Sequence, residues 1–334
     1  MKSHPPQNPP QNQQDPDRLI VQSTRLFPKG QGADAYRIEG IAARCDWVFL
    51  SDWIQPQTHL VRNTGTDTPR HIFLSLRAPQ IALRRFAEDI LPRLSQDFIL
   101  VSGSEDATLP QQIDHRWPRG DGQFADDVRA ILDSPYLRHW FVENLDTDGI
   151  ARMSPLPIGL VFPEGYPETG IAVPPTTPLG QRPLRVLCAH HHREGPQWEP
   201  RRHVSGLAKH AWSDWCTVLD APIPLPDYLR LIDGHAFVLC VEGGGLDPAP
   251  KAWHALLHGA IPIMRRNPTS DGYADLPVVH VPDWTEDSLS LEKLQLWQAQ
   301  YAPRQDDPDK RRALLEQLGL DYWWEKIRQK APIR

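Results

Sequence analysis

A glycine-rich stretch in the second half of the chain has the residue types and spacing of an anion-binding loop. The apolar run Ala236–Val241 has the length and composition of a buried strand, and Glu242–Gly245 follows it directly. A helix is predicted next, over Ala249–His258. Glycines let an anion approach the backbone, and the free N–H groups and positive dipole end of a helix N-terminus attract it. The pattern therefore predicts a phosphate-binding loop.

Lys251 supports this interpretation. A cation in the first turn of a helix is disfavoured by the helix dipole unless an anion is also present. The loop matches neither the GxxxxGK[ST] motif nor a GxGxxG motif with an acidic residue about 20 positions further on. A tight strand-to-helix turn, as found in many α/β proteins, would explain the same glycines. Both interpretations stay open on the local pattern.

The elements around the loop predict a parallel sheet. Asp247 suits the N-cap of the helix, Pro248 its first position and Gly259 its end. The apolar runs Ile261–Met264 and Leu276–Val281 predict two further strands. A strand, loop, helix and strand in this order imply parallel pairing with a right-handed crossover. In such sheets ligands bind beyond the carboxyl ends of the strands.

The same stretch resembles the C-terminal half of the exostosin-like glycosyltransferases and their bacterial relatives, which have the GT-B fold. The residues that carry the resemblance are Phe237–Cys240, Glu242–Gly245, Lys251, Trp253–Leu256, Gly259 and Ile261–Ile263. Weaker agreement extends to Phe98–Pro110 and His139–Gly159. The family usually has Glu where this chain has His254, and that Glu is expected to hold a ribose or sugar hydroxyl.

The resemblance implies an α/β protein with two Rossmann-like domains facing a cleft. It also implies an inverting, metal-independent transfer of a sugar from a nucleotide-sugar donor to a saccharide hydroxyl, without a cofactor. UDP and GDP are the default donor nucleotides. The donor-binding residues would be Glu242, Gly243, Gly244, Gly245, Lys251, His254, Arg201 and His190.

Asp106 is the candidate catalytic residue. It follows the predicted strand Gln96–Val101 in the sequence Ser-Gly-Ser-Glu-Asp. An inverting transfer needs a base for the proton of the acceptor hydroxyl, and a carboxylate of the acceptor-side domain suits this role. An ordinary turn carboxylate is the competing interpretation. The alternative bases are Glu105, Glu143 and Asp114. The predicted acceptor-side residues are Ser102, Glu143 and Asn144.

Two motifs raise the question of a metal. The side chains of His190–His192 alternate in direction on a strand, so at most two of them could converge. Asp146–Asp148 form a DxD motif that could share one cation, but with Gly149 they also form an ordinary turn. We predict no metal. Arg201 and Arg202, at the start of a helix, would neutralise a diphosphate instead, unless they are simply exposed.

Length and composition indicate a two-domain globular protein. The 334 residues suffice for two cores, and the charged fraction of 23% is ordinary. A net charge of −6 argues against nucleic-acid binding. No apolar run approaches the roughly 20 residues that cross a bilayer, and no signal peptide is visible, so we expect a cytoplasmic protein. Four scattered cysteines predict buried, reduced thiols.

Proline content and periodicity divide the chain. Residues 1–18 form a Pro/Gln-rich tract that is predicted to be disordered. Residues 19–160 alternate strands and helices and form the predicted N-terminal, acceptor-side α/β domain. The proline-rich residues 161–183 are the predicted linker. Residues 184–334 form the predicted C-terminal, nucleotide-sugar-binding α/β domain with its C-terminal helices, the last of which the resemblance places against the first domain.

Two competing functions stay open. A pyruvyl or phosphoryl transferase that acts on polysaccharide would use the same anion site on the same scaffold. A non-catalytic saccharide- or nucleotide-binding protein is favoured by His254, which replaces the family's Glu. The expected partners are a nucleotide sugar and a saccharide acceptor. The sequence predicts no oligomeric state.

Overall fold

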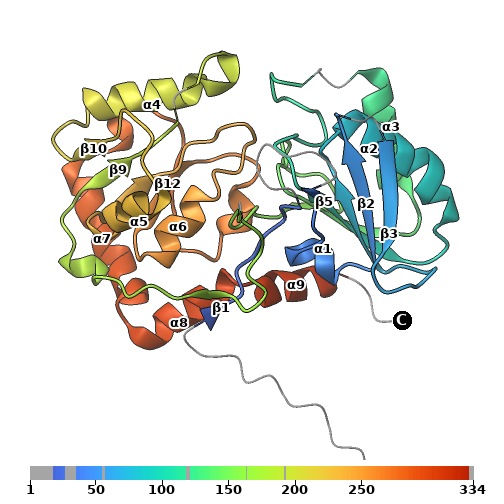
Figure 1. Ribbon diagram of the computed structural model, residues 1–334. Helices are drawn as coiled ribbons and strands as arrows, with labels where there is room; N and C mark the ends of the chain where they lie inside the picture. Colours follow the sequence, from blue (N-terminus) through green and yellow to red (C-terminus); the bar gives the residue numbers. More distant parts are fainter. Residues whose placement is uncertain are drawn as a thin grey trace, which may run out of the picture.

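The computed structural model describes residues 18–26, 35–54, 57–117, 121–162, 164–191 and 193–330. It contains two α/β domains that lie side by side, each built on its own largely parallel sheet (Figure 1). The prediction of two Rossmann-like domains is therefore confirmed. The predicted disordered tail lies outside the described residues except for Arg18, which begins the short strand β1 (Arg18–Leu19).

The first domain is built on a six-stranded sheet in the order β3-β2-β4-β5-β6-β7. The strands are β2 (Trp47–Asp52), β3 (Gln57–Arg62), β4 (His71–Ser75), β5 (Phe98–Gly103), β6 (Leu137–Val142) and β7 (Met153–Pro155). Neighbouring strands are parallel except for β3, which pairs antiparallel with β2 at the edge. Every residue of β5 is buried, which explains why its sequence is a continuous apolar run.

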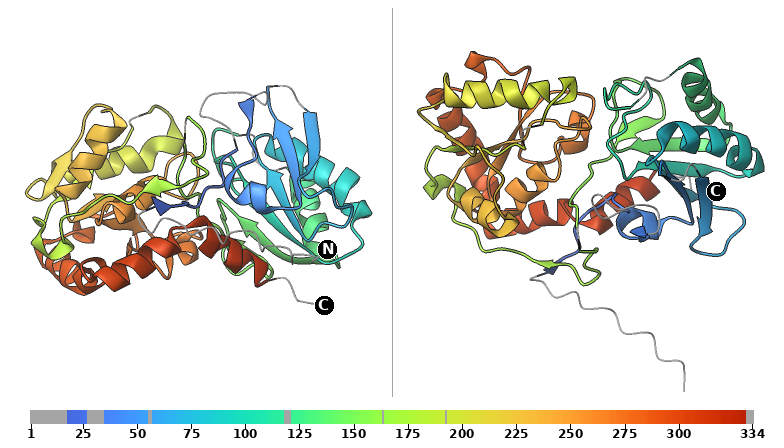
Figure 2. Two further views of the ribbon diagram at one scale, coloured as in Figure 1. Left: turned by 60° about the horizontal axis from the view of Figure 1, so that its bottom comes forward. Right: turned by 45° about the horizontal axis from the view of Figure 1, so that its top comes forward.

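Helices cover both faces of this sheet. On one face, α2 (Pro79–Arg85) and α3 (Gly122–Asp133) pack through residues such as Leu83 and Phe124. Asp121 caps α3 by accepting a hydrogen bond from the backbone N–H of Phe124. The other face is covered by α1 (Gly40–Arg44) and by the last helix of the chain (Figure 2).

The second domain is built on a five-stranded, all-parallel sheet in the order β10-β9-β11-β12-β13. The strands are β9 (Val186–Cys188), β10 (Cys216–Val218), β11 (Phe237–Leu239), β12 (Ile261–Arg265) and β13 (Val279–Val281). The helices are α4 (Glu199–Lys209), α5 (Leu225–Asp233), α6 (Lys251–Leu257), α7 (Leu291–Gln305) and α8 (Pro308–Gln317). One face packs on α4 and α7 and the other on α5 and α6, so the sheet is doubly wound.

The two ends of the described chain tie the domains together. The last helix, α9 (Leu320–Arg328), reaches the first domain, where Asp321 forms an ion pair with Arg44 at 2.7 Å. Near the N-terminus, the backbone N–H of Gln22 donates to the carbonyl of Leu318, just before α9. The position that the resemblance implied for the last helix is confirmed by these contacts. One hydrophobic cluster extends across both domains.

Some predicted elements differ from those observed. The edge strand β3 was not predicted, because its residues alternate between exposed and half-buried positions and give no apolar run. The predicted linker, residues 161–183, contains the strand β8 (Ile171–Ala172), which pairs antiparallel with β1. Its limits, and those of the two domains, stay a prediction.

The four cysteines, Cys45, Cys188, Cys216 and Cys240, are all buried and unpaired, as predicted. Burial raises the pKa of each thiol, for example to about 12 for Cys240, so the thiols are protonated at neutral pH. Among the helices in the described part of the chain, none is both long enough and apolar enough to span a bilayer.

Candidate interdomain active site

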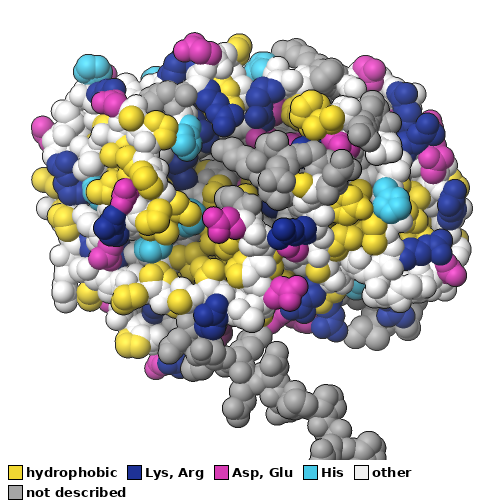
Figure 3. Space-filling model, viewed as in Figure 1, with side chains coloured by type: hydrophobic (Ala, Val, Ile, Leu, Met, Phe, Trp, Pro, Cys, Tyr) yellow, Lys and Arg dark blue, Asp and Glu magenta, His cyan; other side chains and the backbone are white. Residues whose placement is uncertain are grey.

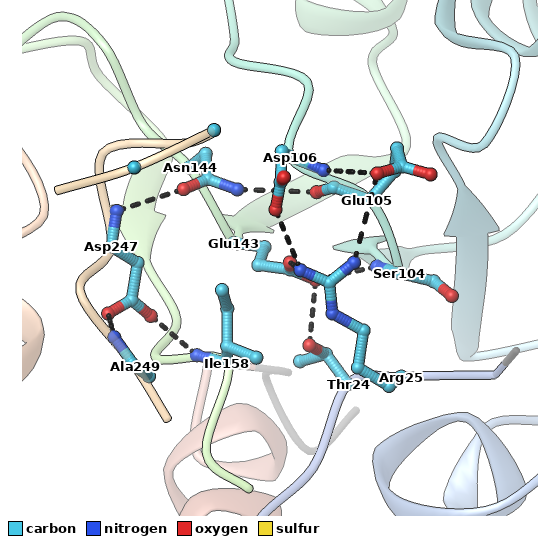
Figure 4. A network of polar contacts seen from close by, with 12 residues as sticks. Thr24, Arg25, Ser104, Glu105, Asp106, Glu143, Asn144, Ile158, Asp247 and Ala249 are labelled. Carbon is cyan, nitrogen blue, oxygen red and sulfur yellow. Dashed lines mark hydrogen bonds and ion pairs between the residues drawn. The ribbon is translucent and has the colours of Figure 1, made fainter. Parts of the chain in front are cut away.

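The carboxyl ends of the strands of both sheets meet at the boundary between the domains. In the first domain, the loops after β5 and β6 begin at Ser104 and Glu143, and in the second the loop after β11 contains Glu242–Gly245. Oδ1 of Asn144 accepts a hydrogen bond at 3.0 Å from the backbone N–H of Asp247, across the boundary (Figure 4). Polar groups that the sequence placed in separate domains therefore lie at one interdomain site.

Asp106 is held between two arginines. Its Oδ1 accepts a hydrogen bond from Arg25 and its Oδ2 accepts one from Arg116, each at 2.9 Å. Burial by itself would raise the pKa of Asp106, but the two guanidinium groups outweigh it and lower that pKa to about 2. Asp106 is therefore ionised at neutral pH and already has two cationic partners.

Glu143 lies beneath this pair and has no exposed side-chain surface. Its Oε2 accepts hydrogen bonds from the hydroxyl of Thr24 at 2.7 Å and from the backbone N–H of Ser104 at 2.5 Å. Its Oε1 lies 3.3 Å from Nη2 of Arg25 (Figure 4). Burial raises the pKa of Glu143 to about 7, although Arg25 opposes the shift. Glu143 therefore holds the side chain of Arg25 and the start of the loop after β5 in position.

The other two predicted acceptor-side residues have different surroundings. Ser102 is fully buried in β5, and its hydroxyl accepts a hydrogen bond at 2.9 Å from the indole N–H of Trp140. Asn144 is also fully buried; its amide donates to the carbonyl of Glu105 at 3.3 Å and accepts from Asp247. The structure thus brings Asn144 to the interdomain boundary and leaves Ser102 inside the first sheet.

The glycine loop, Gly243–Gly245, is packed against side chains of both domains. A Cβ atom on its first glycine would lie 2.1 Å from Nη2 of Arg201, and one on its third would lie 2.3 Å from Oδ1 of Asn144. A Cβ on the middle glycine would lie 2.0 Å from Oδ2 of Asp106. None of the three glycines has a positive φ. A side chain at any of these positions would displace the charged or amide groups that approach the loop backbone closely.

The predicted helix start behind the loop is wrong. Helix α6 begins at Lys251 with Pro250 as its N-cap, and it has seven residues. Asp247 does not cap it, because this buried carboxylate accepts hydrogen bonds from the backbone N–H groups of Ile158 at 2.6 Å and Ala249 at 3.0 Å, and from the hydroxyl of Tyr273. Burial raises the pKa of Asp247. The glycine loop therefore does not open directly onto a helix N-terminus.

Three arginines surround the indole ring of Trp198, which lies just before α4. The guanidinium carbons of Arg193, Arg201 and Arg116 lie 4.8, 4.9 and 5.4 Å from its ring centroid. Nε of Arg201 donates to the carbonyl of Glu242 at 3.1 Å. Burial lowers the pKa of Arg201 to about 10; Asp106 opposes the shift and Arg193 adds to it. In Figure 3, Lys and Arg side chains lie on both sides of the upper part of the interdomain boundary.

These three arginines differ in whether a carboxylate contacts them. Arg116 pairs with Asp106 at 2.9 Å and with Asp114 at 2.7 Å. Neither Arg193 nor Arg201 forms an ion pair with any carboxylate of the described residues. The second domain therefore presents two cations at this boundary whose charge the described protein does not neutralise by direct contact.

The remaining predicted donor residues lie around this cluster. Glu242 is buried and forms an ion pair with Arg265, whose other terminal nitrogen lies 3.5 Å from Asp283. Lys251 begins α6, and its charge contributes to lowering the pKa of His254, which burial brings to about 4. The ring of His254 packs edge-on against Tyr228. His190, just beyond β9, is also buried.

Four residues of this region were not predicted as site residues from the sequence: Arg25, Arg116, Arg193 and Trp198. Arg25 and Arg116 lie in irregular segments, where neither periodicity nor a motif marks them. Trp198 was one of 12 tryptophans, and nothing in the pattern distinguished it. Arg193 follows the histidine triplet directly, which was the one available signal. Arg202, predicted with Arg201, pairs instead with Glu199 in the same helix.

In the described part of the two motifs weighed for metal binding, the side chains do not gather into a metal-binding group. Asp146 accepts hydrogen bonds from the backbone N–H groups of Gln111 and Gln112, and Asp148 is exposed. Of the histidine triplet, His192 lies outside the described residues. Across the ranges that the structure describes, no group of three or more His, Cys, Asp or Glu side chains could hold a metal ion.

The chain has structural relatives that are distant from it in sequence. No protein-family model and no curated protein matches this chain. Among solved structures, it is similar to the crystal structure of TarM, with 7% identity, a TM-score of 0.42, and coverage of 84% of this chain and 60% of that one. It is also similar to the apo structure of OtsA, with 10% identity, a TM-score of 0.45, and coverage of 80% and 74%. Such scores carry no functional argument, and the exostosin-like family stays a prediction.

Proposed function

We propose that this protein is a glycosyltransferase that moves a sugar from a nucleotide-sugar donor, carrying UDP or GDP, to a saccharide hydroxyl. The observation that carries the proposal is the pair of uncompensated cations, Arg193 and Arg201, at the carboxyl edge of the second sheet. Arg201 lies close enough to the carboxylate of Asp106 in the first domain for that charge to raise its pKa, and Arg193 is exposed beside it on Trp198. An anion site opposite a candidate base is the arrangement that transfer from a nucleoside diphosphate needs.

The arginines would act on the leaving group. When the acceptor oxygen attacks the anomeric carbon, the bond from that carbon to the donor phosphate oxygen breaks, and negative charge grows on the diphosphate. Guanidinium groups placed before the reaction stabilise such charge through strong, charge-assisted hydrogen bonds. Arg201 suits this role because burial has already lowered its pKa, and an anion would relieve that cost.

Asp106 would take the proton of the acceptor hydroxyl while the acceptor oxygen attacks the anomeric carbon from the side opposite the diphosphate, and this single displacement inverts the configuration at that carbon. The carboxylate is ionised, as a base must be, but its two arginine partners weaken its affinity for a proton. The proposed role therefore requires one of the arginines to leave Asp106 in the working complex. Arg116 is the one that also contacts the second domain.

The test is a panel of UDP- and GDP-sugars, each incubated with the protein and a mixture of saccharide acceptors, with nucleoside diphosphate release and product mass as the readouts. We expect release with at least one donor and a large loss of turnover in Asp106→Asn. Nucleoside diphosphate at about 100 times Kd should stabilise the fold by about 2.7 kcal/mol. A full panel without binding or release would contradict the proposal. Product formation from phosphoenolpyruvate instead would indicate a pyruvyl transferase.

A non-catalytic binding protein is the second candidate. Two observations favour it: Asp106 is already paired with two arginines, and His254, where the family has Glu, is half-buried with a pKa lowered to about 4, so it is neutral at pH 7. Nucleotide-sugar binding without turnover, together with unchanged affinity in Asp106→Asn, would establish this alternative over the enzyme.

A further inference from the structure

Two carboxylates at the interdomain site share one nitrogen atom of Arg25. Its Nη2 donates a hydrogen bond to Oδ1 of Asp106 at 2.9 Å and lies 3.3 Å from Oε1 of Glu143. That Oε1 is buried and accepts no hydrogen bond from the described residues. The other oxygen of Glu143 is already held by the hydroxyl of Thr24 and the backbone N–H of Ser104. Asp106 therefore takes the hydrogen bond of this nitrogen, and Glu143 contacts the same nitrogen through the ion pair alone.

The described charged groups around Glu143 and Arg25 come from three further segments of the chain. Arg25 itself lies in the segment before α1, and Glu105 and Asp106 lie in the loop after β5 (Figure 4). Asp247, in the loop after β11, is close enough to Arg25 for that charge to act on its pKa. Arg25 is therefore the cation that these carboxylates have in common. Because the side chain of Glu143 has no exposed surface, water does little to screen the charges around it.

The charge of Glu143 changes in the range where the protein would work. Burial raises its pKa to about 7, and the charge of Asp106 adds to the rise. When Glu143 is neutral, the full charge of Arg25 acts on Asp106. When Glu143 ionises, Arg25 is divided between two carboxylates, and Asp106 also faces a second negative charge. Both effects increase the affinity of Asp106 for a proton. Asp106 needs this increase as a base, because its arginine partners hold its pKa at about 2.

We propose that Glu143 is a positioning residue for the base Asp106: by sharing Arg25, its carboxylate weakens the hold of that arginine on Asp106 and increases the affinity of Asp106 for the proton of the acceptor hydroxyl. The inference rests on the proposed role of Asp106. It requires no movement of the backbone, because both carboxylates already lie within 3.3 Å of the same nitrogen. The release of one arginine, which the role of Asp106 requires, and the sharing of the other act in the same direction.

The coupling between the two carboxylates is reciprocal, which makes it measurable without any substrate. Whatever free energy the charge of Glu143 adds to the protonation of Asp106, the charge of Asp106 adds to the protonation of Glu143. Asp106 titrates at about pH 2, where Glu143 is already neutral, so the titration of Asp106 does not report the coupling. The pKa of Glu143 does report it, because Asp106 is ionised at pH 7.

The first test measures the pKa of Glu143 by NMR, in the full-length protein with glutamate labelled with carbon-13 at the side-chain carboxyl group. The Glu143→Gln variant, which retains an oxygen acceptor, identifies the resonance. We expect the pKa of Glu143 to fall by about one pH unit or more in Asp106→Asn. Glu105→Gln is the matched control, because Glu105 lies 4.0 Å from Arg25 and should lower the pKa of Glu143 less than half as far. An unchanged pKa in Asp106→Asn, or equal changes in the two variants, would overturn the inference.

The second test is the pH profile of sugar transfer. As Glu143 ionises, kcat/KM of the wild-type protein should rise about three- to tenfold between about pH 6 and 8. In Glu143→Gln it should stay at the lower level, with an unchanged KM for the nucleotide sugar. A merely structural role of Glu143 would instead lower the activity of this variant by the same factor at every pH, and that result would overturn its role in the reaction.

The inference and the proposed function can fail separately. A lowered pKa of Glu143 in Asp106→Asn, without turnover of any nucleotide sugar by the wild-type protein, would remove the proposed reaction and retain the coupling of the two carboxylates through Arg25. Turnover by the wild-type protein, with the pKa of Glu143 unchanged in Asp106→Asn, would retain the reaction and remove the role of Glu143.

Discussion

The two domains present groups of opposite charge to each other at their boundary. The carboxylates of the first domain and the arginines of the second differ in the partners that they contact. On the first domain, Asp106 and Glu143 each contact Arg25, and Glu143 also accepts two hydrogen bonds while fully buried. On the second domain, Arg193 and Arg201 have an indole face and a backbone carbonyl as partners. The carboxylates of this acidic edge thus contact a cation of the protein, whereas the two arginines of the opposite edge contact no carboxylate among the described residues.

This difference distinguishes residues that stabilise the fold from residues that are expected to bind a ligand. Removal of one member of a buried ion pair leaves its partners unpaired, which costs stability. An uncompensated, partly buried cation costs stability until an anion arrives. Substitutions on the acidic edge should therefore act on stability, and those on the arginine edge should act on affinity.

The largest effect is expected for Glu143→Ala. The change leaves the buried N–H of Ser104 and the hydroxyl of Thr24 without their acceptor and removes a carboxylate from Arg25. We expect a loss of about 3 kcal/mol in the free energy of unfolding, measured by urea titration. Glu105→Ala is the control, because Glu105 lies 4.0 Å from Arg25, and it should cost under about 1 kcal/mol. Equal losses for the two variants would contradict the distinction.

Arg201→Ala should have the opposite profile. Loss of a charge-assisted contact of about 1.5–3 kcal/mol should weaken nucleoside diphosphate binding about 10- to 150-fold, by calorimetry. The melting temperature should stay the same or rise, because a partly buried cation that has no ion pair is removed. Lys209→Ala is the control in the same helix, since the side chain of Lys209 is 43% exposed and pairs with Asp220. A stability loss in Arg201→Ala at unchanged affinity would make Arg201 a structural residue.

The two carboxylates of the acidic edge should also differ in their pH dependence. The lowered pKa of Asp106 means that its stabilisation is present above the usual 3.8 and is lost as the pH falls through about 2. The raised pKa of Glu143 gives the opposite pH dependence. Its contribution to the free energy of unfolding is fully present below pH 4.5 and is lost as the pH rises through about 7. Urea titrations from pH 2 to 8 should therefore show Asp106→Asn without the acid loss and Glu143→Gln without the loss towards neutral pH.

The fold could be predicted from the sequence because buried parallel strands are continuous apolar runs. Strand β5 and the unit from β11 to β12 were located in this way, and β6 was predicted although Arg138 and His139 interrupt its apolar residues. The edge strand β3 could not be, because it is neither an apolar run nor fully buried on one face. Periodicity reports what an element buries, and an edge strand buries little.

The site was predicted in part. The sequence located the glycine loop correctly, but glycine shows only that something approaches the backbone. The structure shows that Arg201, Asp106 and Asn144 do so. Arg25 could not have been predicted, because the tertiary fold alone brings residues 21–26 beneath the loop after β5. Irregular segments have no periodic pattern, so the position of their side chains in the fold cannot be inferred from the sequence.

The smallest effect is expected for Lys251→Ala. Lys251 begins α6, and its charge acts on the pKa of Cys240 and His254. Because the arginines supply the main positive charge, nucleoside diphosphate affinity should fall less than tenfold, by calorimetry, and less than in Arg201→Ala. A cation at a helix start is disfavoured by about 0.3–1 kcal/mol, so stability should change by no more than that. A larger loss of affinity than in Arg201→Ala would move the anion site to α6.

A crystal structure of the protein with bound UDP or GDP tests the central claim most directly. We expect the diphosphate to lie at the domain boundary, next to Trp198. Its phosphate oxygens should be within hydrogen-bond distance of the guanidinium group of Arg201. Asp106 should lie on the opposite side of the anion, in the first domain. A nucleotide bound away from this boundary, with Arg193 and Arg201 still without an anion, would contradict the account.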